Sequence, residues 1–216
     1  MLPLTLYPDG ASPLKILCLG SHSDDIEIGC GGTILRLLSR NQNLEVVWVV
    51  FSSSKEREQE ARNSAGLFLE QAKRKEIIIN HFCDGYFPFE GAQIKDSFEG
   101  LKVLSPDLIL THNRKDAHQD HRLIAELTWN TFRDHLILEY EIPKYDGDMG
   151  QPSMFVPIEE EVCQKKVRYI MSAFESQRHK RWFQQEIFLS LMRLRGMECN
   201  APSGYAEAFY CHKLVL

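Results

Sequence analysis

Short apolar runs alternate along the chain with longer segments whose apolar residues recur at helical spacing. The apolar runs cover residues 15–19, 44–51, 76–80 and 107–111. Each run has the length of a strand, and a strand that is buried on both faces reads as a continuous apolar run. We therefore predict four buried strands that are connected by helices.

Apolar residues at intervals of three and four predict where these helices lie. One helix is expected to begin at the glycine pair Gly31-Gly32 and to continue through Leu38. Further helices are expected over residues 55–69, 120–132, 159–174 and 182–195. Strands that alternate with helices favour a parallel sheet. The predicted fold is therefore an α/β fold with a Rossmann-like, doubly wound and mostly parallel sheet that is flanked by helices.

The size and composition of the chain favour a single domain. Its 216 residues fall within the usual range for one domain, and hydrophobic residues at 44% are enough for a continuous core. We expect one domain over residues 1–216. The alternative is a main domain with a small C-terminal lobe, which residues 150–216 would form.

The charge pattern and the apolar segments argue against two classes of partner. The net charge is -5 and no long block of Lys and Arg occurs, whereas a surface that binds nucleic acid is normally basic. The longest apolar stretch, residues 46–51, is far shorter than the roughly 20 residues that cross a membrane. We predict no nucleic-acid partner and no membrane span, and a homo-oligomer remains compatible with the sequence.

Cysteine usage and the first residues of the chain bear on location. The six cysteines include no Cys-x-x-Cys pair, which favours reduced thiols over a disulfide framework. Residues 1–7 lack the basic segment and the sustained apolar segment of a signal peptide. Both observations favour a cytoplasmic location.

Two clusters of histidine and aspartate follow predicted strands. Residues 22–25 have the sequence His-Ser-Asp-Asp, and residues 118–121 have the sequence His-Gln-Asp-His. Imidazoles and carboxylates crowded at the end of a strand lose solvation unless a cation holds them together. Because ligands of open α/β sheets bind at the carboxyl ends of the strands, neighbouring strands would bring both clusters to one site. Nitrogen and oxygen ligands suit Zn²⁺ better than Ca²⁺ or Mg²⁺, although Fe²⁺ or another divalent transition metal fits them too.

The two clusters resemble the signatures of the LmbE-like or PIG-L-like zinc-dependent N-acetylglucosaminyl deacetylases, which are His-Pro-Asp-Asp and His-Pro-Asp-His. Weaker matches lie at residues 57–61, at Asp84-Gly85 and at residues 206–209, so the resemblance covers almost the whole chain. Ser23 and Gln119 replace the usual prolines of the signatures. Neither position coordinates the metal in this family, so we expect the chemistry to be kept.

The resemblance implies a role for each matched residue. It implies three zinc ligands, which are His22, Asp25 and His121. Two imidazoles and one carboxylate leave an open coordination position, as in catalytic zinc sites. Asp24 is the implied general base. His118 is expected to be protonated and to stabilise the oxyanion or act as an acid, with Asp120 tuning His118 from behind.

Three further residues are predicted to bind substrate. The resemblance places Arg57 and Asp84 near the sugar, and their alternative interpretations are a helix-surface charge and a turn residue. Arg114 lies with Lys115 in a basic stretch before the second cluster, near the predicted rim of the site, where ordinary solvation is the alternative. Together these cations predict an N-acetylglucosamine-type sugar that carries an anionic group.

The predicted function is zinc-dependent hydrolysis of the N-acetyl group of an N-acetylglucosamine-type sugar or sugar conjugate, which releases acetate and a free amine. One alternative is the hydrolysis of another N-acyl or carbamoyl small molecule by the same zinc chemistry. A second alternative is a regulatory module that binds a metal or a nucleotide without turnover. The presence of Asp24 beside the ligands argues against this module, because binding alone needs no base there.

Overall fold

A computed structural model describes residues 13–41 and 43–215. The prediction of no signal peptide rests on residues 1–7, which lie outside this range. In the described part of the chain, seven strands form one sheet in the order β3-β2-β1-β4-β5-β7-β6. The strands are β1 Leu14–Gly20, β2 Leu44–Val50, β3 Arg74–Ile79, β4 Leu108–His112, β5 Leu136–Tyr140, β6 Met154–Pro157 and β7 Ala206–Cys211.

The sheet is mostly parallel, as predicted. Strands β1 to β5 run parallel to one another, whereas β7 pairs antiparallel with both β5 and β6. The four predicted strands correspond to β1, β2, β3 and β4. The apolar pattern did not reveal β5 and β7, because Glu139 and Glu207 interrupt their apolar runs, and it did not reveal β6, which has only four residues.

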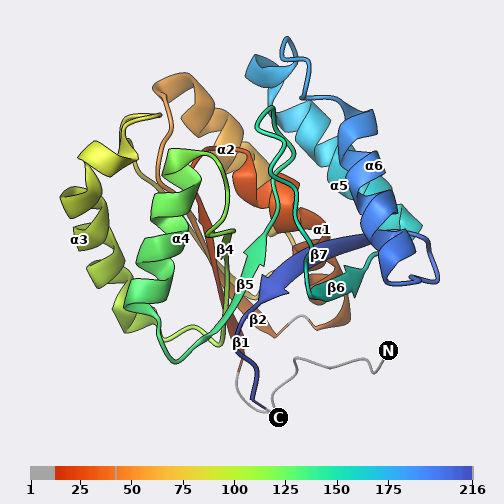
Figure 1. Ribbon diagram of the computed structural model, residues 1–216, viewed down its shortest axis with the longest axis horizontal. Coiled ribbons are helices and arrows are strands. Elements are labelled where there is room, and N and C mark those ends of the chain that lie inside the picture. The colour runs from red at the N-terminus through yellow and green to blue at the C-terminus, as the bar shows by residue number, and fades with distance from the viewer. Residues whose placement is uncertain (1–12, 42, 216) are drawn as a thin grey trace.

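Helices cover both faces of the sheet (Figure 1). One face is covered by α1 Asp25–Arg40, α2 Lys55–Phe68, α5 Glu160–Ala173 and α6 Gln185–Glu198, and the other by α3 Gly91–Leu101 and α4 Gln119–Thr131. Short 3-10 turns occur at Phe87–Phe89, Lys102–Leu104 and Glu175–Gln177. The predicted positions of α2, α4 and α5 are confirmed to within about a residue, whereas α6 lies three residues further along the chain than predicted.

The predicted start of α1 at the glycine pair is wrong, because the helix begins at Asp25 and runs through Gly31 and Gly32. Gly32 admits a carboxylate from β7, whereas a Cβ atom on Gly31 would meet the ring of Phe68 on α2. The backbone N–H groups of Gly32 and Thr33 donate to Glu207 at 2.8 and 2.7 Å. A Cβ atom on Gly32 would lie only 2.8 Å from Glu207 Oε1, so a larger residue would displace the carboxylate.

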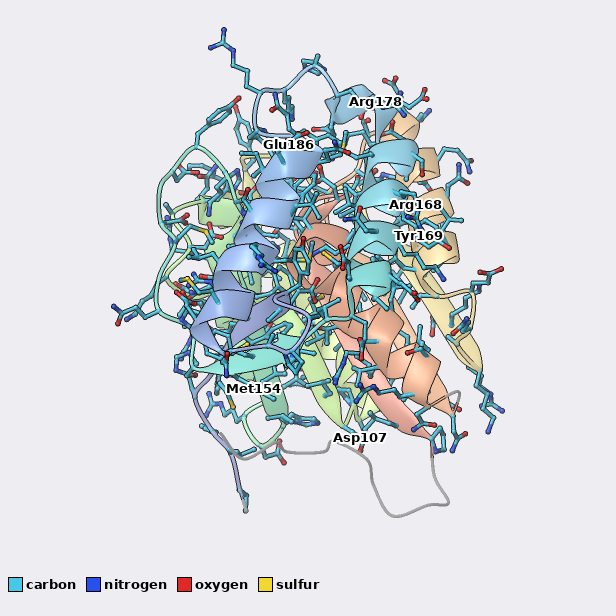
Figure 2. The ribbon with its side chains drawn as sticks, turned by 90° about the vertical axis from the view of Figure 1, so that its right-hand side faces the viewer. Asp107, Met154, Arg168, Tyr169, Arg178 and Glu186 are labelled. Atoms are coloured by element: carbon cyan, nitrogen blue, oxygen red, sulfur yellow. The ribbon has the colours of Figure 1, made fainter. Side chains whose placement is uncertain are left out.

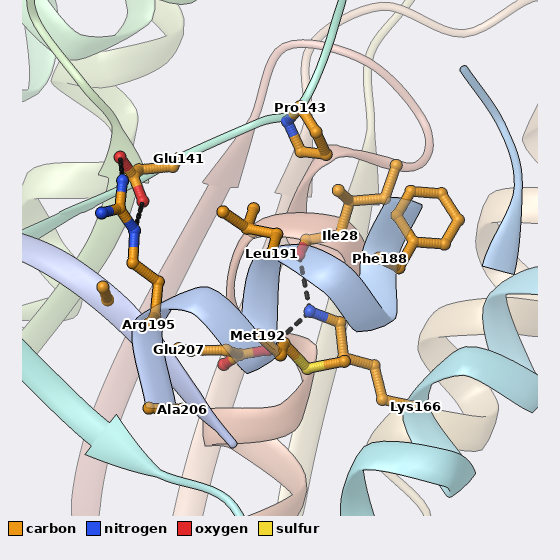
Figure 3. A pocket seen from close by; sticks show the side chains of 12 residues that line it. Ile28, Glu141, Pro143, Lys166, Phe188, Leu191, Met192, Arg195, Ala206 and Glu207 are labelled. Carbon is orange, nitrogen blue, oxygen red and sulfur yellow. Dashed lines mark hydrogen bonds and ion pairs between the residues drawn. The ribbon is translucent and has the colours of Figure 1, made fainter. Parts of the chain in front are cut away.

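Lys166 on α5 completes this contact between α1 and β7 (Figure 3). Its Nζ donates to Glu207 Oε1 at 2.6 Å and to the carbonyl oxygen of Ile28 at 2.7 Å. Both charged side chains are 3% exposed, so the pair is fully withdrawn from water. This buried ion pair joins α1, α5 and β7.

Residues 150–215 share the sheet and the core with the rest of the described chain. Apolar side chains of α5, α6 and β7 pack into the same cluster as those of β1, β2 and α1. Figure 2 shows α5 and α6 side by side, with Arg178 and Glu186 at one end of the molecule and Asp107 and Met154 at the other. This continuity supports our proposal that the chain forms one domain.

Two further observations concern the membrane and the thiols. Among residues 13–41 and 43–215, no helix combines the length and the apolar character of a membrane span. All six cysteines are free thiols, and four of them are buried.

Breaking the buried ion pair is expected to destabilise the fold. Lys166→Met should lower the free energy of unfolding by about 3 kcal/mol, because the charge of Glu207 stays buried and keeps only its two backbone donors. Urea denaturation would measure this loss. Lys95→Met removes one of the two lysine partners of the exposed Glu99 and should cost less than about 1 kcal/mol. Equal small losses for both variants would contradict the structural role of Lys166.

Candidate active site

The first cluster lies in the turn that joins β1 to α1. Asp25 is the first residue of α1, and its Oδ2 accepts a hydrogen bond from the backbone N–H of His22 at 2.6 Å. A carboxylate is stabilised at this position because the N-terminus of a helix carries a partial positive charge. His22, Asp24 and Asp25 are all buried. The turn therefore presents its acids and its imidazole to the interior of the site.

The second cluster reaches the same edge of the sheet because β4 lies next to β1, with Cys18 opposite Leu110. His118 caps the N-terminus of α4, where its Nδ1 accepts the backbone N–H of Asp120 at 3.2 Å. His121 follows in the first turn of α4 and is buried. The structure thus brings the two predicted clusters into contact.

Three side chains converge with the geometry of a metal site. His22 Nδ1 lies 3.3 Å from Asp25 Oδ2 and 3.2 Å from His121 Nε2. Asp25 Oδ2 lies 3.5 Å from His121 Nε2. A tetrahedral zinc ion with bonds of about 2.0–2.1 Å holds its ligand atoms about 3.3 Å apart. The predicted ligand set therefore fits a zinc ion in both chemistry and spacing.

The charge of Asp25 is stabilised by the imidazoles around it. Burial acts to raise the pKa of this carboxyl, but the neighbouring His121, His112 and His22 hold the pKa well below its usual range. A low pKa suits a carboxylate ligand, which has to be ionised to bind a metal.

Asp24 has one occupied oxygen and one free oxygen. Arg57, in the first turn of α2, donates from Nη2 to Asp24 Oδ1 at 2.9 Å. The other oxygen, Oδ2, is buried and has no hydrogen-bond partner among the described residues. This arrangement fixes the carboxylate and leaves one oxygen available to accept a proton. Arg57 was expected to bind substrate, and the contact that the structure shows is with Asp24.

His118 is half-buried beside the other two imidazoles, with its ring centroid 4.6 Å from that of His121. Burial, followed by the nearby His121 and His22, lowers the pKa of His118. Because Nδ1 accepts a hydrogen bond, the proton of the neutral ring lies on Nε2. The geometry thus favours a neutral hydrogen-bond donor over the protonated His118 that we expected.

Asp84 and Asp120 lie on the outer side of His22. Asp84 Oδ1 is 3.0 Å from His22 Nε2, and this contact with the His22 imidazole lowers the pKa of Asp84 to about 2. Asp120 accepts the backbone N–H groups of Gly85 at 2.6 Å and Phe87 at 3.2 Å. We expected Asp120 to tune His118. Its carboxylate instead holds the loop that carries Asp84 and lies 3.4 Å from His22 Nε2.

Arg114 is engaged elsewhere. Its Nε pairs with the buried Glu139 at 2.8 Å, and its guanidinium lies over the ring of Trp129 at 4.4 Å. Among the described residues, no contact joins Arg114 to the histidine and aspartate cluster. These contacts give no support to the predicted substrate-binding role of Arg114.

Two residues of the site were not predicted. His112, at the end of β4, is fully buried, and its Nε2 lies 3.2 Å from Asp25 Oδ2 and accepts the backbone N–H of Ser21 at 2.9 Å. Asp116 is also buried, and its Oδ2 lies 3.0 Å from His121 Nδ1. The sequence signals were weak: His112 ends an apolar run, and Asp116 is one acid in a polar stretch.

Comparisons with known proteins agree with this site. Residues 17–132, more than half of the 216 residues, match the model of the PIG-L family, GlcNAc-PI de-N-acetylase. The chain belongs to this family. It is 27% identical over 160 residues to the uncharacterized deacetylase YaiS of Escherichia coli (strain K12). The aligned region covers 68% of this chain and 83% of YaiS. Family membership identifies the chain as a hydrolytic N-deacetylase.

Solved structures share the fold. The N,N'-diacetylchitobiose deacetylase from Pyrococcus horikoshii superposes with a TM-score of 0.71 at 20% identity, covering 92% of this chain and 83% of that chain. GalB, the 4-carboxy-2-hydroxymuconate hydratase from Pseudomonas putida KT2440, superposes with a TM-score of 0.73 at 17% identity, covering 94% of this chain and 98% of that chain. Because a hydratase has the same fold, the fold by itself does not define the reaction.

Replacing Arg57 tests whether this residue positions Asp24 or binds substrate. Arg57→Met should lower kcat about 100-fold, because the freed Asp24 carboxylate loses its position, while KM for an N-acetylated substrate changes little. Steady-state kinetics would measure both constants. Arg62→Met, which removes an ion pair with Glu58 on the same helix, serves as the control. A raised KM with unchanged kcat would instead indicate that Arg57 binds substrate.

Proposed function

We propose that this protein is a zinc-dependent deacetylase that hydrolyses the N-acetyl group of an N-acetylglucosamine-type sugar or sugar conjugate. One observation carries the proposal. Three buried ligand atoms, on His22, Asp25 and His121, lie 3.2–3.5 Å apart. Asp24, which directly precedes the ligand Asp25, has one carboxylate oxygen without a hydrogen-bond partner among the described residues. A structural metal site needs no such unpaired carboxylate oxygen.

The ligand set accounts for the choice of metal. Two imidazole nitrogens and one carboxylate oxygen suit Zn²⁺ and also accept Fe²⁺. When bound, such an ion lowers the pKa of water to about 7 and polarises a carbonyl group. With three protein ligands, the position for water or substrate stays open.

The surrounding residues supply the proton transfers. Asp24 Oδ2 accepts a proton from the attacking water, whose oxygen forms a bond to the acetamide carbonyl carbon. Arg57 holds the other oxygen of Asp24 and so aims the free one. The Nε2–H group of His118 donates a hydrogen bond to the carbonyl oxygen as negative charge develops there. When the carbon–nitrogen bond breaks, the proton held by Asp24 passes to the leaving nitrogen, and acetate and a free amine are released.

A sugar substrate has two sources of support. The family takes its description from a GlcNAc-PI de-N-acetylase, and a structural neighbour deacetylates diacetylchitobiose. In this chain, the Asp84 side chain is 66% exposed beside His22, where a carboxylate can accept hydrogen bonds from sugar hydroxyl groups. Arg57 and Arg114 already pair with Asp24 and Glu139, so they do not support the predicted anionic group on the substrate.

The alternative substrates use the same residues. Another N-acyl or carbamoyl compound would meet the same base and the same ligands, because the site acts on the amide rather than on the group attached to it. A regulatory module without turnover is disfavoured by the free oxygen of Asp24. The six free thiols support our proposal of a cytoplasmic location.

Metal content tests the ligand set. Protein purified without chelator is expected to hold close to one zinc or iron ion per chain, and His22→Ala and His121→Ala should each lose most of it. Elemental analysis would measure the metal. His81→Ala is the matched control, since His81 contacts Ser53 and Glu58 rather than the cluster. Unchanged metal in both ligand variants would refute the assignment.

A substrate panel tests the reaction. Amine release should be fastest from N-acetylglucosamine or an N-acetylated glucosamine conjugate, and slower from N-acetyl amino acids and carbamoyl compounds. Asp24→Asn should keep the metal and lower kcat on the best substrate by about 10²–10⁴-fold, because the proton acceptor is lost. Faster release from the compounds without a sugar would favour the alternative. Full activity of metal-loaded Asp24→Asn would require another base.

A further inference from the structure

A buried polar network joins two loops at the metal-ligand edge of the sheet. One loop, residues 113–118, precedes α4, and the other, residues 141–150, follows β5. Three charged side chains, Asp116, Lys144 and Asp148, connect them. None of these residues belongs to the ligand set or to the proton-transfer residues described above.

Asp116 fixes the orientation of His121. Its Oδ2 lies 3.0 Å from His121 Nδ1, and its Oδ1 accepts the backbone N–H of His118 at 2.8 Å. Because Nδ1 of His121 donates to Asp116, the lone pair lies on Nε2, which faces Asp25. A carboxylate behind an imidazole ligand sets its tautomer and ring orientation in this way.

Lys144 holds Asp116 from the other loop. Its Nζ lies 3.0 Å from Asp116 Oδ2, the same oxygen that contacts His121. Asp148 binds the same Nζ at 2.5 and 2.7 Å and also accepts the backbone N–H of Ala117 at 2.6 Å. Lys144 thereby connects both loops through the carboxylate behind His121.

Burial distinguishes this network from an ordinary surface ion pair. The side chains of Lys144, Asp116 and Asp148 are 11%, 3% and 14% exposed. By comparison, Lys95 and its partner Glu99 are 30% and 44% exposed. A largely desolvated pair fixes its partners more strongly than a solvated one.

We propose that Lys144 is a positioning residue for the metal site, which it supports by holding Asp116 where that carboxylate orients His121. The inference rests on the proposed metal site, because it concerns the strength of metal binding there. Lys144 itself touches neither the ligand atoms nor Asp24. Its effect on metal affinity therefore passes through Asp116.

The test is a double-mutant cycle read out as zinc affinity. Zinc ions alone are titrated against a competing chelator, with wild-type protein, Lys144→Met, Asp116→Asn and the double variant. Removing a carboxylate or its support behind a ligand typically weakens metal binding about 10–100-fold, so we expect a loss in this range for Lys144→Met. In the Asp116→Asn background, Lys144→Met should cause almost no further loss. Lys144→Arg should retain most of the affinity, and Lys95→Met should match the wild type.

Three outcomes would overturn the inference. They are an unchanged zinc affinity in folded Lys144→Met, losses that multiply in the double variant, and a loss in Lys144→Arg equal to that in Lys144→Met. If Lys144→Met does not fold, Asp148→Asn replaces it, with the same expected coupling to Asp116. Failure of the metal site itself is distinguishable, because the wild-type protein would then bind no zinc.

Discussion

The parallel pairing of β1 with β4 is the constraint on which the site depends. It brings His22 and His121, which are 99 residues apart in the chain, to a ring-nitrogen distance of 3.2 Å. The strands themselves carry only apolar side chains at their paired positions. Their order in the sheet nevertheless decides which loops meet, because the loops follow the carboxyl ends of adjacent strands.

Asp25 is the electrostatic centre of the cluster that results. Its Oδ2 lies within 3.5 Å of ring nitrogens of His22, His112 and His121. Two further acids contact these rings on the side away from Asp25. Asp84 contacts His22, and Asp116 contacts His121. The inner carboxylate of Asp25 and the outer carboxylates of Asp84 and Asp116 therefore hold the rings of His22 and His121 from both sides.

Buried ion pairs outside the site support the elements that carry it. Lys166 and Glu207 connect α1 to α5 and β7, and α1 begins with Asp25. Arg195 on α6 makes a two-pronged contact with Glu141, at the start of the loop that carries Lys144. Charges are costly to bury, so such pairs specify one arrangement of the helices only when every donor and acceptor is matched. Here they constrain α1 and residues 141–150.

Local patterns in the sequence determined the parallel strands, most of the helices and both histidine and aspartate clusters, because apolar spacing and neighbouring side chains act over a few residues. Tertiary structure decided what depends on distant residues. It decided that α1 passes through Gly31 and Gly32, since Glu207 arrives there from β7. It also decided that Arg57 holds Asp24, that Arg114 pairs with Glu139, and that His112 and Asp116 join the site. Each of these contacts joins residues from different loops, helices or strands. Apolar spacing along the chain does not say which of these elements become neighbours, so only the folded chain shows which groups pair.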